Sequence, residues 1–130
     1  MIVLDTHAWI WHLTDPGKLS DRSRTLIERE RGMRGVKVSS ISVWELLMLI
    51  KRGRLELSLS PASFLRRAER LSYVEYVPID NAIAQASVEL PDIHRDPADR
   101  LILATARELG CGVLSMDRRL AEYGVVAVLW

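Results

Sequence analysis

The sequence predicts an α/β fold in three layers, with a five-stranded parallel sheet flanked by helices. Two observations predict it. Short apolar runs without polar alternation occur along the chain, which is typical of strands covered on both faces. Between them lie longer segments that begin at helix-capping residues, and strands that alternate with helices form βαβ crossovers. The 130 residues and the 48% hydrophobic composition suit one compact domain, residues 1–130.

The first half of the chain is expected to form two strands and three helices. The strands are residues 1–5 and 36–38, the helices are residues 9–13, 21–33 and 42–53, and residues 15–17 form a turn. Ser20 is placed to cap the second helix, which Gly32 and Gly35 end. In the third helix, Ser42-x-x-Glu45 has the pattern of a capping box.

The second half is expected to form three strands and four helices. The strands are residues 73–79, 111–115 and 125–130, and the helices begin at residue 61 or cover residues 80–89, 96–109 and 118–123. Pro61 suits a first helical position, Asp80 and Asp96 are placed as caps, and Gly110 closes the helix before it.

Composition excludes several classes of protein. The net charge of +1 does not indicate a general nucleic-acid binder. No apolar stretch reaches the ~18 residues of a membrane span, and the start, with a charge at Asp5 and no basic region, is not expected to be a signal peptide. The lone Cys111 cannot form an internal disulfide, which favours a reducing cytoplasm.

Four acidic residues, Asp5, Glu45, Asp99 and Asp117, are the main candidates for function. Asp5 and Asp117 follow expected strands, and the other two lie in the first turns of expected helices. In a parallel sheet these positions share one edge, where ligands bind. Carboxylates gathered there repel one another unless a cation lies between them, and hard oxygen ligands suit Mg²⁺ or Mn²⁺. The pattern indicates a metal-dependent site that handles phosphate.

Each acid also has a purely structural interpretation, which stays open at this point. Asp5 and Asp117 can each cap the helix that follows, and Glu45 can belong to a capping box. Asp96 is sufficient to cap its own helix, which leaves Asp99 free to face a site.

Five blocks carry a resemblance that spans nearly the whole chain. They are Leu4-Asp5-Thr6-His7-Ala8, Ser40-Ile-Ser-Val-Trp44-Glu45, His94-Arg-Asp96-Pro97-Ala-Asp99-Arg100-Leu-Ile-Leu-Ala104, Leu114-Ser115-Met116-Asp117 and Leu129-Trp130. In this ordered set the chain resembles the PIN domain, and within it the VapC-type ribonuclease toxins of bacterial toxin–antitoxin pairs. Two departures occur: Leu49 stands where many relatives carry lysine, and Ser115 where threonine is common.

The resemblance implies that the four acids bind Mg²⁺ or Mn²⁺ and cleave RNA, leaving a 5′ phosphate and a 3′ hydroxyl. We expect Asp5 and Asp99 to be the principal ligands. The resemblance also implies a small cognate antitoxin that covers the site, and homodimers. Supporting residues are also expected: Thr6, Ser40, Asp96 and Ser115 to orient the ligands, and Arg100 and Arg118 to hold substrate phosphates.

Two other functions compete with this hypothesis. One is a metal-binding PIN module that does not cut and serves as an interaction partner. The other is a phospho-acceptor receiver domain, which is disfavoured because Asp5 has no acidic neighbour and no lysine follows residue 51. Trp9, Ile10 and residues 46–50 are candidate contacts with an antitoxin or a second copy, and burial in the core is their alternative.

Overall fold

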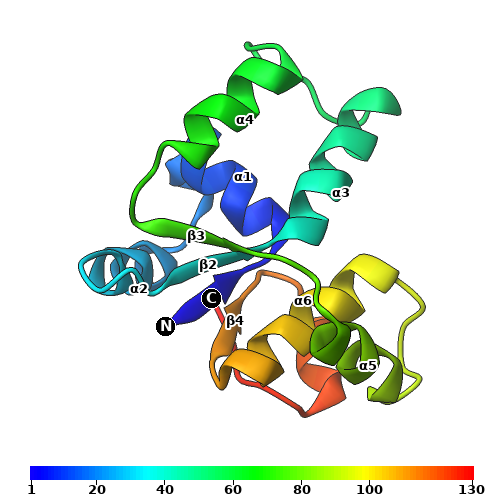
Figure 1. Ribbon diagram of the computed structural model, residues 1–130. Helices are drawn as coiled ribbons and strands as arrows, with labels where there is room; N and C mark the ends of the chain where they lie inside the picture. Colours follow the sequence, from blue (N-terminus) through cyan, green and yellow to red (C-terminus); the bar gives the residue numbers. More distant parts are fainter.

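The computed structural model describes residues 1–130, and its centre is a parallel sheet of five strands (Figure 1). The strands are β1 (Ile2–Leu4), β2 (Val36–Ser39), β3 (Val74–Val77), β4 (Gly112–Leu114) and β5 (Val128–Leu129). Their order across the sheet is β3-β2-β1-β4-β5, and every neighbouring pair is parallel. The predicted five-stranded parallel sheet is confirmed.

Six α-helices and two short 3₁₀ helices connect the strands. They are α1 (Thr6–Thr14), η1 (Pro16–Lys18), α2 (Asp21–Arg31), α3 (Ser40–Lys51), α4 (Pro61–Glu69), α5 (Asn81–Glu89), α6 (Pro97–Leu109) and η2 (Arg118–Tyr123). None of these helices combines the length and the apolar character that a membrane crossing requires.

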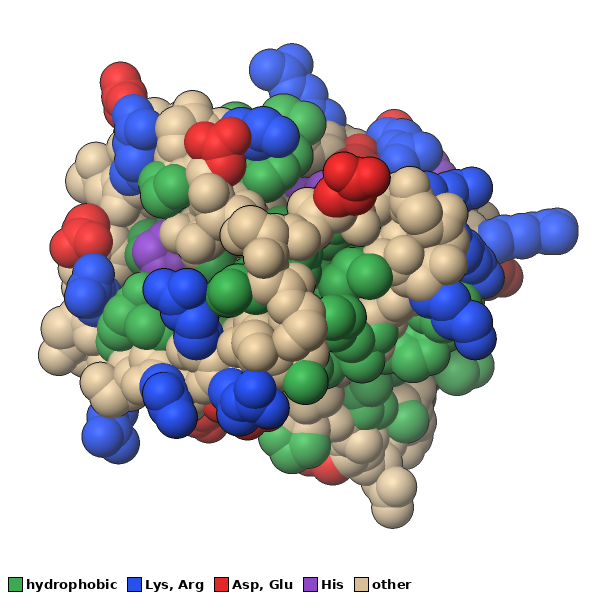
Figure 2. All heavy atoms as spheres, turned by 90° about the horizontal axis from the view of Figure 1, so that it is seen from above, with side chains coloured by type: hydrophobic (Ala, Val, Ile, Leu, Met, Phe, Trp, Pro, Cys, Tyr) green, Lys and Arg blue, Asp and Glu red, His purple; other side chains and the backbone are tan.

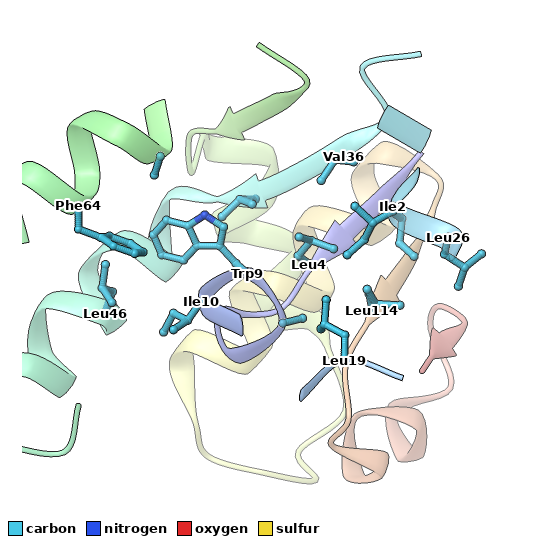
Figure 3. Close-up of a cluster of buried hydrophobic side chains, with 14 residues drawn as sticks. Ile2, Leu4, Trp9, Ile10, Leu19, Leu26, Val36, Leu46, Phe64 and Leu114 are labelled. Carbon is cyan, nitrogen blue, oxygen red and sulfur yellow. The ribbon is translucent and has the colours of Figure 1, made fainter. Parts of the chain in front are cut away.

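The central strand β1 is buried on both faces, because its side chains alternate between two cores. Ile2 and Leu4 face the larger core, which α1 to α4 cover, and Val3 faces the core under α5, α6 and η2. At the centre of the larger core lies Trp9, whose indole packs edge-on against the ring of Phe64 (Figure 3). This two-sided burial explains why the strand has no polar alternation.

One charged side chain is buried within the sheet. Lys37, in β2, is only 8% exposed, and its ammonium forms an ion pair with Glu75. The two residues are direct neighbours in the register of β2 and β3. An opposite charge on the adjacent strand is what allows a lysine to occupy a buried strand position.

Several expected boundaries are wrong by a few residues, and one error changes the interpretation of the site. Helix α3 begins at Ser40, with Ser39 as its cap, because β2 runs into the helix without a loop. The capping box is therefore wrong: Ser42 lies inside the helix and its hydroxyl hydrogen-bonds that of Thr6 at 2.9 Å. Glu45 lies in the second turn of α3, not in the first.

The last strand is also shorter than expected. Residues 125–130 were predicted to be extended, but only Val128 and Leu129 pair with β4. The third strand keeps four of its seven expected residues, Val74–Val77. Both strands lie at the edges of the sheet, where pairing on one side alone holds them.

Candidate functional site

The candidate site lies where the three central strands end. Leu4 is paired with Val38 on one side and with Leu114 on the other. The next residues along these strands are Asp5, Ser39 and Ser115, so the parallel register brings them to one edge of the sheet. Both serines are buried, and Asp5 is partly exposed.

Asp5 uses its two carboxylate oxygens for two different contacts. Oδ1 accepts a hydrogen bond from the backbone N–H of Ala8 at 2.8 Å and so caps α1. Oδ2 accepts one from the Ser115 hydroxyl, whose oxygen in turn accepts the backbone N–H of Asp117 at 3.0 Å. Burial raises the pKa of Asp5, and these hydrogen bonds oppose the rise. The structural interpretation of Asp5 as a helix cap is therefore confirmed, and its role as a ligand stays a prediction.

Glu45 is held near the site by α3. Burial raises its pKa most, the Thr6 hydroxyl lowers it, and the negative charges of Asp96 and Asp5 raise it further. Thr6 is itself fixed by the Ser42 hydroxyl at 2.9 Å, so two buried hydroxyls connect α1 with α3 beside this carboxylate. Each of them is placed by the first turn of its own helix.

Asp99 lies in the first turn of α6 and is free of the capping role. Asp96 caps the helix by accepting hydrogen bonds from the N–H groups of Ala98, at 2.9 Å, and Asp99, at 3.4 Å. Burial, followed by the charges of Asp96 and Glu45, raises the pKa of Asp99 to about 7. No protein donor bonds the Asp99 carboxylate, so no hydrogen bond opposes the rise in its pKa that burial causes.

Asp117 caps η2 and forms an ion pair with Arg119. The Arg119 Nε lies 3.0 Å from Oδ1, and its Nη2 lies 2.8 Å from Oδ2. This pairing lowers the pKa of Asp117, the reverse of the shifts at the other three acids. Sequence reasoning assigned Arg118, which is exposed and makes no contact with these acids, and missed Arg119.

The four predicted acids lie near one edge of the sheet, close enough for their charges to change one another's pKa. The pKa of Asp99 rises through the charges of Glu45, Asp117 and Asp5 as well as that of Asp96. In the present side-chain positions no three acidic, histidine or cysteine side chains are close enough to share one ion. The arrangement is therefore a negatively charged edge and not an assembled ion site.

Two of the expected supporting residues have different places. Ser40 makes no side-chain hydrogen bond. The neighbouring serines make the contacts that were expected of it: Ser39 caps α3, and the Ser42 hydroxyl hydrogen-bonds that of Thr6. The signal was present in the three serines at positions 39, 40 and 42, but the sequence does not say which of them faces the site.

Arg100 also departs from its expected role. Its guanidinium donates to the backbone oxygens of Pro91 and Ser87, each at 2.8 Å, and of Leu90 at 2.9 Å. These carbonyls end α5 and begin the loop that leads to α6. Arg100 thus joins the two helices, and its contacts do not support the expectation that it holds a substrate phosphate.

Arg100→Ala is expected to lower the free energy of unfolding by about 2 kcal/mol, because it leaves several carbonyl oxygens without a donor. Chemical denaturation measures the change. Arg107→Ala, which removes an exposed arginine from the same helix, is the control and should change stability little. If the Arg100→Ala protein were as stable as the wild type and had lost only its affinity for RNA, Arg100 would contact the substrate, as expected from the sequence.

Asp99→Asn is expected to stabilise the protein when divalent ions are chelated. With a pKa of about 7, folded Asp99 keeps a proton that the unfolded chain releases near pH 4. The stability linked to this proton is complete below about pH 4 and is lost as the pH rises to about 7. The melting temperature of the variant, relative to that of the wild type, should therefore rise by a few °C between pH 5 and pH 8.

Thermal melting in a chelator over that pH range tests this expectation. Asp92→Asn, in the exposed loop before α6, should follow the wild type at every pH. A melting temperature for Asp99→Asn at or below that of the wild type at pH 8 would show that this carboxylate is not under electrostatic strain.

Comparison with known proteins identifies the family. Residues 2–126 match the PIN domain. The ribonuclease VapC22 of Mycobacterium tuberculosis is 34% identical over 123 residues, which cover 94% of this chain and 91% of that protein.

Solved structures share the fold over nearly the full length. The FitAcB structure from Neisseria gonorrhoeae has a TM-score of 0.70 at 22% identity and covers 100% of this chain, which spans 97% of that one. The VapBC2 structure from Rickettsia felis, bound to a DNA fragment from their promoter, has a TM-score of 0.73 at 16% identity, with coverage of 98% and 97%. The chain thus belongs to the PIN-domain family, among its VapC-type members.

Proposed function

We propose that this protein is a divalent-metal-dependent endoribonuclease and the toxin of a toxin–antitoxin pair. The observation that carries the proposal is the convergence of Asp5, Glu45, Asp99 and Asp117, which repel one another at one edge of the sheet. The similarity to a protein named ribonuclease supports the choice of RNA as substrate.

The residues present fit Mg²⁺ or Mn²⁺ by their chemistry. All four side chains offer carboxylate oxygens, and burial with mutual repulsion raises the pKa of Asp5, Glu45 and Asp99. A cation among them relieves this repulsion and favours the charged forms. Asp5 and Asp99 would be the principal ligands, joined by Glu45 and by Asp117 once it turns from Arg119.

The chain's own residues prepare this chemistry. When bound, the ion would supply the Lewis acidity that activates a water and offsets charge on the scissile phosphate. Ser115 fixes the direction of the Asp5 carboxylate, and Thr6 does the same for Glu45. Arg119, once released from Asp117, is a cation within reach of the substrate phosphate.

The antitoxin is proposed to bind an apolar hollow beside α1 and α4. The hollow has a volume of about 510 Å³, and Ile10, Trp11, Leu57, Leu59 and Phe64 are among the side chains that line it. Solved structures that share this fold include a toxin–antitoxin complex from Klebsiella pneumoniae, with a TM-score of 0.64. A homodimer remains a prediction.

The surface around α4 suits a partner that combines apolar and acidic side chains. Figure 2 looks onto the face that carries α4 and the C-terminal end of α3, and it shows many lysines and arginines, several acidic side chains, and hydrophobic side chains between them. Of the expected contacts, Trp9 and Leu46 are 0% exposed and pack in the core. Ile10 is 3% exposed but also lines the hollow, and Leu47 is 38% exposed.

Asp5→Asn is expected to reduce Mn²⁺-dependent RNA cleavage about a hundredfold or more, because it removes a charge from the principal ligand pair. Ser115→Ala should reduce it about tenfold, since Asp5 loses the group that orients it. The readouts are the cleavage rate and the rise in melting temperature on adding Mn²⁺, which Asp5→Asn should lose.

Asp15→Asn, an exposed carboxylate after α1, is the matched control and should retain both cleavage and the Mn²⁺ effect. Undiminished metal-dependent cleavage by Asp5→Asn would refute the proposed site. A wild-type protein stabilised by Mn²⁺ but inert toward every RNA would support the non-cutting PIN module instead.

Leu57→Asp is expected to weaken antitoxin binding about tenfold or more, because it places a charge in the apolar hollow. Calorimetric titration with the purified product of the adjacent reading frame measures the affinity. Val88→Asp, on α5 at a position that is 79% exposed, is the control. Equal affinities of both variants and the wild type would place the antitoxin elsewhere.

A further inference from the structure

A second groove opens directly beside the acidic site. It has a volume of about 300 Å³ and lies between α3 and the start of α6. Its lining residues include Glu45, Asp96, Trp44, Arg52 and Arg54. Because Glu45 belongs to both the groove and the four-acid site, a long ligand can occupy the two together.

Helix α3 arranges one side of this groove in a regular way. Trp44, Met48 and Arg52 are spaced by four residues, so they lie along one face of the helix. The rise of 1.5 Å per residue places Arg52 about 12 Å beyond Trp44. In Figure 1, α3 runs outward from the end of β2, so this face leads from the acidic edge toward the helix tip.

Trp44 differs from the other tryptophans of the chain. Trp9 is 0% exposed, and the rings of Trp11 and Trp130 pack against each other at 6.0 Å. Trp44 is 54% exposed and contacts no other aromatic ring. An exposed indole beside a catalytic edge has a free flat surface on which a base can stack.

Arg52 and Arg54 supply the charge that the acidic edge lacks. Both are exposed, and neither forms an ion pair. They flank Gly53, whose positive φ of 68° ends α3 and turns the chain. A cluster of carboxylates repels a phosphate backbone, so an anionic substrate needs positive charge next to the place where it is cut.

We propose that this groove binds single-stranded RNA next to the scissile bond, with one base stacked on Trp44 and backbone phosphates held by Arg52 and Arg54. The inference rests on the proposed ribonuclease function and adds the residues that hold its substrate. Two arginines without an ion-pair partner, next to an exposed indole, favour RNA, because guanidinium groups pair with phosphates and the indole offers a face for a base.

The strand is single because a base stacks on a side chain only when it has left its neighbours in a duplex. Stacking on Trp44 should depend little on which base is present, since every base offers a flat face. Specificity for one RNA then comes from the remaining walls of the groove and from the fold of the RNA.

The test is binding of a fluorescein-labelled oligoribonucleotide of twelve unpaired nucleotides in EDTA, where metal-dependent cleavage does not occur. R52A/R54A is expected to raise the dissociation constant about tenfold or more. It should also reduce the slope of log affinity against log salt by about 1.4, the value for two phosphate contacts on a single strand.

Trp44→Leu separates stacking from charge. It should raise the dissociation constant about tenfold while leaving the salt slope unchanged, and it should remove the quenching of tryptophan fluorescence on RNA binding. The control R22A/R107A removes two exposed arginines from α2 and the far end of α6 and should bind as the wild type does. Melting temperatures confirm that each variant is folded.

The outcomes separate this inference from the proposed function. Loss of binding in R52A/R54A and Trp44→Leu, with a wild type that cuts no RNA, supports the groove and refutes the nuclease. Normal cleavage and binding in both variants refute the groove alone. An equal loss of RNA binding in R22A/R107A would show general attraction to positive charge and would overturn the inference. Unchanged RNA binding in R52A/R54A and Trp44→Leu, together with a change in oligomeric state, would also overturn it.

Discussion

The parallel pairing of β1 with both of its neighbours is the constraint on which the rest of this structure depends. It places Asp5 next to Ser115 and Ser39, and it requires every strand to return through a helix on one of the two faces. The helices that follow β1 and β2 start at once at this edge, so Thr6, Ser42 and Glu45 come to it with no connecting loop. A slip of one residue in β1 would turn Val3 to the wrong core and move Asp5 from the edge.

The negative charges at this edge oppose stability. Asp99 has no hydrogen-bond donor for its carboxylate, and the nearby charges of Asp96 and Glu45 add to the effect of burial. The fold compensates elsewhere: Arg100 satisfies the carbonyls at the end of α5, and Lys37 with Glu75 keeps a buried strand position neutral. Well-bonded polar groups thus surround the site, while the Asp99 carboxylate within it is left without a donor.

Most of the fold could be predicted from the sequence, and so could the position of the four acids near one edge of the sheet, because both follow from local patterns. Apolar runs without alternation reveal β1 and β2, and Asp96-Pro97 marks the start of α6 correctly. The roles of Arg100 and Arg119 could not be predicted, because they depend on which carbonyl or carboxylate oxygens each guanidinium contacts in the folded chain. Ser39 and Ser40 are equally good caps in the sequence, and only the end of β2 decides between them. The groove along α3 required the placement of α6 against it.

The ion pair between Asp117 and Arg119 has a consequence for when the site is filled. A guanidinium already contacts both oxygens of that carboxylate. At the proposed metal site an ion would therefore bind Asp117 by exchange with Arg119, and exchange reduces the apparent affinity by the fraction of molecules in which Asp117 is free. Arg119 would thus set a threshold, because Asp117 would join the ion only as the concentration of divalent ions rises.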